Sequence, residues 1–253
     1  MDFFHFHIQM IQRSTGRSAV AAAAYRSGAR IVNTWDGTVR DYTRKQHVVY
    51  NEVMLPANAP PHFADRSMLW NSVEWAEKKR DAQLAREVDM ALPKELPRVA
   101  QIKLVRKFVQ KEFVDAGMCA DVAIHDKEDG NPHAHILLTV RPLDSDGRWA
   151  QKSRLIYDLD DAGQRIALPN GRWKCHKENV MDWDHRQNAE KWRKAAAEAI
   201  NEALREYGFS QSFVDHRSYA RQNVQQIPTV QEGARIRMME KRGIHTELHA
   251  RNL

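Results

Sequence analysis

Three histidines fall within one short segment of the chain, His125, His133 and His135. Side chains alternate between the two faces of a strand, so the spacing of two residues puts His133 and His135 on one face. The intervening stretch 126–132, rich in Asp, Gly and Asn, is typical of a turn that closes an antiparallel hairpin. Any register that pairs His125 with either of the other two then places all three imidazoles on the same face.

Three neutral imidazoles with open coordination positions suit a divalent metal that acts as a Lewis acid. The alternative is that these histidines only form hydrogen bonds or face the solvent. A structural zinc site is disfavoured because the two cysteines, Cys119 and Cys175, lie outside the histidine segment and neither forms a CxxC motif. Two separated thiols fit a reduced, cytoplasmic chain better than a disulfide framework.

Tyr25 is the best candidate for a nucleophile beside such a metal. It follows a run of alanines that lets a helix approach a sheet or a nucleic-acid backbone closely. A phenol has a reference pKa of about 10, so its attack on phosphorus needs a base, a nearby cation or a metal-polarised phosphate. Arg26 and the metal can supply the electrostatic part. Taken alone, a tyrosine at a helix end is more often a packing residue.

Strands and helices alternate along the chain without an internal repeat. The patterns predict strands at 3–11, 47–55, 84–92, 120–125 and 133–141, a hairpin within 31–42, and helices at 19–26, 65–79, 97–116, 186–207 and 230–242. Residues 143–183 show little periodicity, which indicates an extended loop or flap. The predicted fold is therefore α/β (α+β), with a mainly antiparallel central sheet flanked by helices. Neither GxGxxG nor GxxxxGK[ST] occurs, so a dinucleotide or P-loop site has no support.

Length and composition limit the size of the core, the kind of partner and the location of the protein. The chain has 253 residues and is 42% hydrophobic, which is ordinary for a globular protein with one main core. Its 39 Lys and Arg exceed its 33 Asp and Glu, and the formal charge of +6 favours a polyanionic partner. The sequence contains neither a signal-peptide pattern nor an apolar run long enough for a membrane helix. We expect a cytoplasmic protein without membrane insertion.

Six segments together carry a family resemblance. They are His5-Phe-His7, Gly16 to Gly28 with Tyr25, Asp81 to Glu87 with Ala91-Leu-Pro93, His125-Asp with Gly130 to His135, Asp215 to Tyr219, and Glu240 to Ile244. Over nearly its whole length the chain resembles the MobA/MobL (MobQ-type) conjugative relaxases of the HUH endonuclease superfamily. The tyrosine and histidine motifs are the most specific.

The resemblance implies the HUH relaxase fold and site- and strand-specific nicking and rejoining of DNA at a plasmid origin of transfer. Tyr25 would attack the scissile phosphate and form a 5′-phosphotyrosine adduct. His125, His133 and His135 would hold Mg²⁺ or Mn²⁺. The implied partners are single-stranded DNA with a hairpin at the origin, accessory proteins of the relaxosome, and a coupling protein.

Glu87 matches an acidic position of the family, where it either orients a metal-bound histidine or helps to deprotonate Tyr25. The alternative is a strand carboxylate that is solvated or paired with Arg86 or Lys94. Asp126 either supports the first histidine from behind or belongs to the turn, and Asn131 either does the same or shapes the turn before Pro132.

Candidate DNA contacts fall into three groups: the arginines near the tyrosine (Arg13, Arg17, Arg26, Arg30), the histidines of the first strand (His5, His7), and a basic, aromatic stretch of the flap (Arg172, Trp173, Lys174). Basic side chains contact phosphates, and aromatic side chains stack on bases. The alternative for the flap is a surface loop whose tryptophans pack on the core.

For the domain organisation we expect a relaxase domain at 1–220, with the flap-like insertion at 143–183, and a charged, partly helical segment at 221–253. The resemblance also predicts that the chain is one domain of a longer protein. A rolling-circle replication initiator is a rival with the same chemistry, but in that group the nucleophile usually follows the histidine motif, whereas Tyr25 precedes it. Two further rival classes are a trihistidine metallohydrolase and a DNA-binding module without activity.

Overall fold

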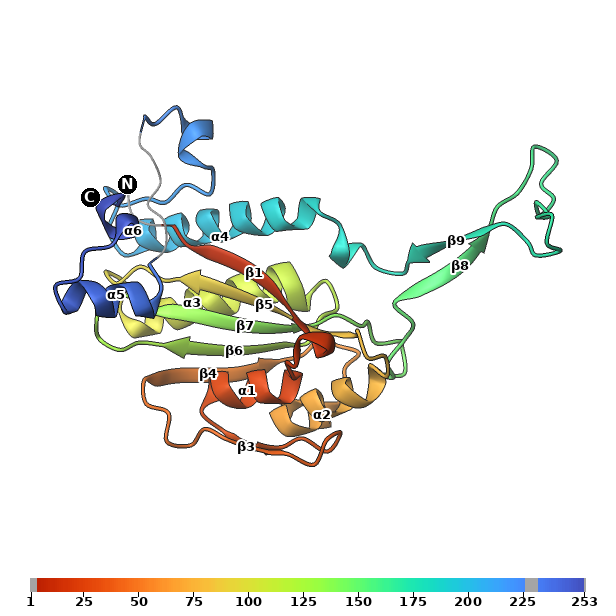
Figure 1. The fold of residues 1–253 in the computed structure, drawn as a ribbon, viewed down its shortest axis with the longest axis horizontal. Coiled ribbons are helices and arrows are strands. Elements are labelled where there is room, and N and C mark those ends of the chain that lie inside the picture. Colours follow the sequence, from red (N-terminus) through yellow and green to blue (C-terminus); the bar gives the residue numbers. More distant parts are fainter. Residues whose placement is uncertain (1–3, 226–231, 253) are drawn as a thin grey trace. The chain divides into compact units, whose positions relative to one another are not determined.

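A five-stranded antiparallel sheet forms the centre of the protein (Figure 1). The computed structural model describes residues 4–225 and 232–252, which form two compact units, Met1–Asp215 and His216–Leu253. The strands of the first unit follow the order β1-β5-β7-β6-β4. Their bounds are β1 (Phe6–Gln12), β4 (Val48–Met54), β5 (Gln83–Ala91), β6 (Ala120–His125) and β7 (His133–Thr139). The predicted α+β class and mainly antiparallel sheet are confirmed.

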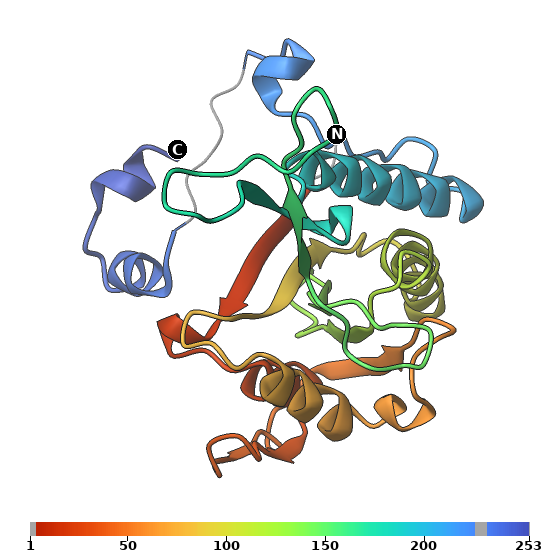
Figure 2. The same ribbon diagram turned by 90° about the vertical axis from the view of Figure 1, so that its right-hand side faces the viewer.

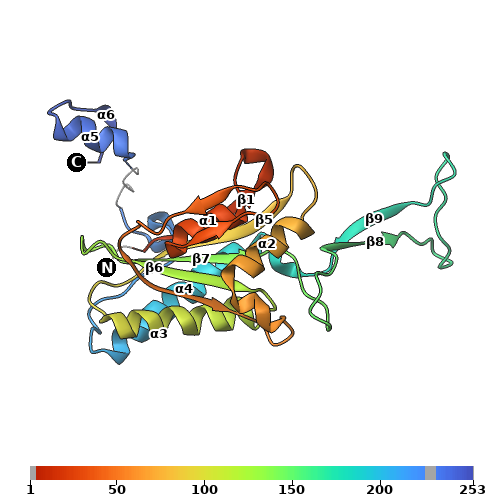
Figure 3. The same ribbon diagram turned by 90° about the horizontal axis from the view of Figure 1, so that it is seen from below.

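Helices cover both faces of this sheet, as the view in Figure 2 shows. One layer holds α1 (Ala19–Ser27) and α2 (Arg66–Ala76), which Figure 3 shows in front of the sheet. The other layer holds α3 (Arg98–Val109) and α4 (Gln187–Glu206). Each layer has its own hydrophobic core. The alanines of α1 are small, which lets that helix pack closely against α2 and the sheet.

The alternation of side chains decides what each face presents. In β7, Ala134, Ile136 and Leu138 are buried in the core beneath α3 and α4. His133 and His135, which alternate with these residues, therefore point toward the α1 layer. In β1 the apolar residues follow the same rule, so the first-strand alternation predicted from the sequence is confirmed. His133 and His135 of β7 therefore lie on the α1 face.

The ends of α1 and α2 follow ordinary capping chemistry. The Ser18 side chain accepts a hydrogen bond from the Ala21 amide at the start of α1. Gly28 ends α1 with a φ of 66°, a left-handed conformation that glycine adopts without strain. Asp65 caps α2 by accepting from the amides of Ser67 and Met68. Helix α3 is shorter than expected, because the chain continues from it as a π-helical turn, η3 (Gln110–Val114).

The segment 143–183, expected to be an extended loop or flap, contains two regular strands. These strands, β8 (Ser153–Tyr157) and β9 (Cys175–Asn179), pair antiparallel and form an arm separate from the central sheet (Figures 1 and 3). The alternative of an extended loop without regular structure is therefore wrong. Both strands are largely exposed. A strand shows alternating hydrophobicity only where one of its faces is buried, so no periodic signal marks these two strands in the sequence.

The remaining elements are short. The predicted hairpin within 31–42 is confirmed as β2 (Arg30–Val32) and β3 (Val39–Asp41). Short 3-10 turns lie at η1 (Arg13–Thr15), η2 (Pro61–Ala64), η4 (Asp182–Asp184) and η5 (Tyr219–Gln222).

The second unit contains α5 (Ala234–Lys241) and α6 (Glu247–Ala250). The expected helix 230–242 begins at residues outside the described ranges, and α5 is its described part. Within 4–225 and 232–252, none of the helices is both long and apolar enough to cross a membrane.

Candidate active site

The three histidines of the β6–β7 hairpin lie together on the α1 face of the sheet. His125 pairs directly opposite His133 in the strand register, and His135 follows two residues later, so the predicted hairpin geometry is confirmed. Their ring centroids are 4.7 to 5.6 Å apart. One candidate ligand atom from each ring lies within 4.8 Å of the others. This spacing allows one ion to contact all three rings.

Contacts behind the rings leave one nitrogen of each free for a metal. Nδ1 of His133 donates to the Asn131 carbonyl at 3.0 Å, which leaves its Nε2 as the ligand atom. Nε2 of His125 donates to the Arg26 carbonyl at 2.6 Å, which leaves its Nδ1. Nδ1 of His135 lies 3.6 Å from Glu87, on the side of the ring away from Nε2. The donor set fits a divalent ion with three nitrogen ligands and open positions.

The electrostatic environment keeps two of these rings, His125 and His135, neutral. Burial, together with the nearby His135, Lys45 and His133, lowers the pKa of His125 to about 3, and only the Arg26 carbonyl opposes the change. Burial also lowers the pKa of His135. An imidazole must be neutral to bind a metal, so at neutral pH neither of these two rings has a proton to lose first.

Tyr25 lies in the last turn of α1 and its side chain is 44% exposed. The edge of its ring meets Tyr42 at a centroid distance of 5.2 Å. The Lys45 ammonium lies 3.7 Å from the ring centroid, and the Arg26 guanidinium lies 5.1 Å from it. Such exposure argues against a mere packing residue at a helix end and leaves the phenol accessible to a substrate.

Lys45 joins the tyrosine to the histidine cluster. Its Nζ donates to the Tyr25 carbonyl at 2.9 Å and lies 3.4 Å from Nε2 of His125. Burial lowers the pKa of Lys45 to about 8, with the charges of Arg26 and Lys127 adding to the effect. We did not expect Lys45 from the sequence, where it is one basic residue in a charged loop with no pattern to mark it.

Glu87 is buried beneath α1, with 1% of its side chain exposed. It accepts hydrogen bonds from Gln9 at 2.7 Å and from Arg26, and Arg17 pairs with it at 3.4 Å. The alternative pairing with Arg86 or Lys94 is wrong: Arg86 points to the opposite face of the sheet and pairs with Asp184.

The ionisation of Glu87 follows from these partners. Burial opposes it, but the neighbouring His135 and Arg26 outweigh burial and lower the pKa of Glu87 to about 2. A carboxylate this acidic is a weak base at neutral pH, which favours an orienting role over deprotonation of Tyr25.

The structure distinguishes between the alternatives left open for the two turn residues. Asp126 belongs to the turn, where it accepts from the Glu128 amide at 2.8 Å and pairs with Arg98. Asn131 supports His133 through its backbone carbonyl, a contact that any residue at this position can make.

The four arginines near Tyr25 that are candidate DNA contacts differ in how far other side chains already occupy them. Arg17 and Arg26 lie on Glu87, close to Tyr25. Arg13 is occupied by internal contacts, because its guanidinium pairs with Glu74 at 2.8 Å, donates to carbonyls at the end of α2 and stacks on Trp35. Arg30 is exposed and lies 3.6 Å from Asp41.

The first strand and the arm hold the other candidates. His7 pairs across the sheet with Asp89, which in turn pairs with His135, so the first-strand face with His5 and His7 continues the histidine face. Arg172, Trp173 and Lys174 lie on the arm, outside this cluster. Trp173 is 47% exposed.

Asp89 is a second residue that the sequence did not single out. It lies between His7 and His135 in the strand register. Its Oδ1 is buried and has no hydrogen-bond partner among the described residues. Its charge partly opposes the lowering of the His135 pKa by burial. The only available signal was its place in the β5 alternation, two residues after Glu87.

Comparisons with known proteins place the chain in a family. The sequence model of the MobA/MobL family matches residues 17–242, and the chain belongs to this family. The conjugal transfer protein TraA of Agrobacterium fabrum is 36% identical over 98% of this chain and 23% of its own length. The probable mobilization protein MobA of Bifidobacterium longum is 32% identical over 96% of this chain and 45% of its own length. The chain therefore spans less than half of these relatives.

A solved structure supports the fold. It comes from work on the molecular basis of vancomycin resistance transfer in Staphylococcus aureus, and it matches with a TM-score of 0.73 and 31% identity. The match covers 86% of this chain and 100% of that chain.

Proposed function

We propose that this chain nicks and rejoins one DNA strand at an origin of transfer, with Tyr25 as the nucleophile. The observation that carries the proposal is the meeting of an exposed tyrosine with a cluster of three histidines, joined through Lys45. The relatives named for conjugal transfer and mobilization support DNA as the substrate.

The proposed step is a transesterification. The Tyr25 oxygen forms a bond to the scissile phosphorus while the bond from phosphorus to the 3′ oxygen breaks. The phenol proton is released, the 3′ oxygen gains a proton, and a 5′-phosphotyrosine adduct remains. Because the adduct is itself a phosphodiester, attack by a 3′-OH reverses the step and rejoins the strand without ATP.

The residues around Tyr25 have distinct proposed tasks. His125, His133 and His135 hold Mg²⁺ or Mn²⁺, which when bound polarises the non-bridging phosphate oxygens. Glu87 fixes Arg26 beside the tyrosine and supports His135 from behind. Nitrogen ligands favour the softer ion, Mn²⁺, while cellular abundance favours Mg²⁺.

DNA binding is proposed to use two regions. Arg17 and Arg26 would contact phosphates near the nick, and Arg172, Trp173 and Lys174 of the arm would contact a DNA hairpin beside it. Residues 1–220 form the proposed relaxase domain. Accessory proteins and a coupling protein are proposed partners of the longer protein.

A labelled single-stranded DNA library tests the reaction, the metal and the sequence preference together. With Mn²⁺ or Mg²⁺ the protein should form covalent adducts whose sequencing yields the recognised site, and with chelator it should form none. Tyr25→Phe should lose the adduct but still bind the selected DNA.

Tyr207→Phe is a matched control, because Tyr207 is 40% exposed and lies at the end of α4, in the other helix layer. Metal-dependent cutting that survives Tyr25→Phe would contradict the mechanism and indicate a metallohydrolase. Binding of the library without any cutting would indicate a DNA-binding module.

A further inference from the structure

The last turn of α1 has backbone carbonyls that the helix itself leaves unsatisfied. Two of them receive side-chain donors from other parts of the chain. Lys45 donates to the Tyr25 carbonyl at 2.9 Å, and His125 donates to the Arg26 carbonyl at 2.6 Å. A cation at a helix carboxyl end is also favoured by the helix dipole. The end of α1 is thus tied to the histidine hairpin.

The same ammonium restrains the Tyr25 side chain. It lies 3.7 Å from the centroid of the ring, while Tyr42 contacts the ring with an edge-to-face geometry. A tyrosine with 44% exposure would otherwise sample several rotamers in water. Lys45 and Tyr42 thus both contact the Tyr25 ring.

The loop that carries Lys45 packs closely on the end of α1. The Lys45 amide donates to the Tyr42 carbonyl at 2.9 Å. Gly28 faces this loop so closely that a Cβ there would lie 3.4 Å from the Val48 side chain and 3.8 Å from the Lys45 carbonyl. The backbone under Lys45 is therefore fixed relative to Tyr25.

We propose that Lys45 is a positioning residue for the nicking step: it sets the orientation of the Tyr25 phenol relative to the histidine cluster. This inference rests on the proposed role of Tyr25 as the nucleophile. Misplacing a reacting atom by about 1 Å can cost ~100-fold in rate. Loss of the Lys45 side-chain contacts should therefore slow the chemical step and leave DNA binding almost unchanged.

The test compares Lys45→Met with Arg44→Met in the full chain on a cleavable oligonucleotide. Both variants lose one positive charge from the same loop, but Arg44 is exposed. We expect the single-turnover rate of Lys45→Met to fall ~10- to 100-fold below that of Arg44→Met. The Kd for DNA, measured separately by fluorescence anisotropy, should agree between the two variants within about threefold.

Lys45→Arg and Lys45→Gln complete the design and serve if Lys45→Met does not fold. Arginine keeps a cation that can cover the ring and donate to the carbonyl, so it should recover most of the rate. Glutamine keeps a donor without the charge and should recover less.

Three results would overturn the inference. Lys45→Met could cleave as fast as Arg44→Met, or its Kd could rise by the same factor as its rate falls, which would make Lys45 a phosphate contact. A tenfold loss of Mn²⁺ affinity in calorimetry would instead assign Lys45 to the histidine cluster. If Tyr25→Phe keeps the covalent adduct, the proposed function fails; if Tyr25→Phe abolishes the adduct while Lys45→Met forms it as fast as Arg44→Met, the inference on Lys45 fails alone.

Discussion

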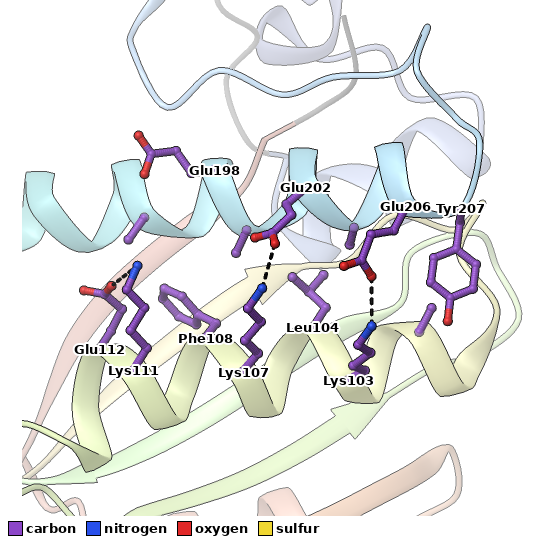
Figure 4. A pocket seen from close by; sticks show the side chains of 14 residues that line it. Lys103, Leu104, Lys107, Phe108, Lys111, Glu112, Glu198, Glu202, Glu206 and Tyr207 are labelled. Carbon is purple, nitrogen blue, oxygen red and sulfur yellow. Dashed lines mark hydrogen bonds and ion pairs between the residues drawn. The ribbon is translucent and has the colours of Figure 1, made fainter.

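Two regions of the molecule are rich in charge but differ in how that charge is arranged. Between α3 and α4 a groove of about 150 Å³ is lined by a row of lysines and a row of glutamates (Figure 4). Lys103 pairs with Glu206 and Lys107 with Glu202, and these side chains are 42 to 62% exposed. On the α1 face, Glu87 is almost fully buried. It accepts a hydrogen bond from Gln9 and forms ion pairs with Arg17 and Arg26.

The difference shows where charge fixes geometry. Exposed ion pairs contribute about 0 to 1 kcal/mol, since water competes for both partners. Burying a carboxylate costs desolvation free energy that its partners must offset. Removing one partner therefore destabilises the fold. The groove therefore holds charges that satisfy one another, whereas Glu87 and its partners fix the position of α1 over the histidines.

The largest expected effect comes from breaking the histidine cluster itself. His135→Ala removes one of three candidate ligands and should weaken Mn²⁺ binding at least ~100-fold and abolish nicking. Isothermal titration calorimetry and a nicking assay measure the two effects. Chelation of the metal from the unmodified chain should reproduce the loss of nicking. Tight metal binding by His135→Ala would contradict the site.

The next largest effect is a loss of stability, and two buried glutamates on the α1 side of the sheet test whether it comes with a loss of metal binding. Glu87→Gln leaves Arg26 without its anionic partner and should lower the free energy of unfolding by about 3 kcal/mol in urea denaturation. Glu74→Gln is the matched variant, because Glu74 of α2 is also buried, pairs with Arg13 and accepts a hydrogen bond from Ser18 at the start of α1. Both variants should lose stability, but only Glu87→Gln should also weaken Mn²⁺ binding. Equal metal binding by the two would remove Glu87 from the site.

Lowering the pH should reveal how much the ionised Glu87 side chain contributes to the free energy of unfolding. The folded-state pKa of Glu87 is about 2, below its ordinary value of 4.5, so its ionised form stabilises the fold above pH 4.5. This contribution, at most about 3 kcal/mol, is lost as the pH falls from 4.5 toward 2. The gap in unfolding free energy between the unmodified chain and Glu87→Gln should therefore shrink across this window. A gap that stays constant would mean that Glu87 is not held ionised by Arg26 and His135.

The smallest effect is expected in the groove. Lys107→Met should change the free energy of unfolding by less than about 1 kcal/mol, and less again in high salt, because its pair with Glu202 is exposed. Nicking should stay at the unmodified rate. A loss of nicking activity in this variant would contradict the view that the exposed ion pairs of the groove have no part in the reaction.

Local patterns in the sequence were enough to predict the elements that have one buried face. The alternation in β1 specified that strand, and the strong turn chemistry between β6 and β7 specified their hairpin. The arm of β8 and β9 lacked this signal, since both faces of its strands are largely exposed.

The sequence by itself determined the chemistry available to this protein: three imidazoles on one face of a hairpin, a tyrosine at a helix end, and the family motifs that join them. Only the tertiary structure decided which side chains contact and position these residues. Lys45 reaches His125 across 80 residues of chain, and Arg26 reaches Glu87 across 61. Contacts over such separations leave no periodic trace in a single sequence, because they arise only when the α1 layer packs on the sheet.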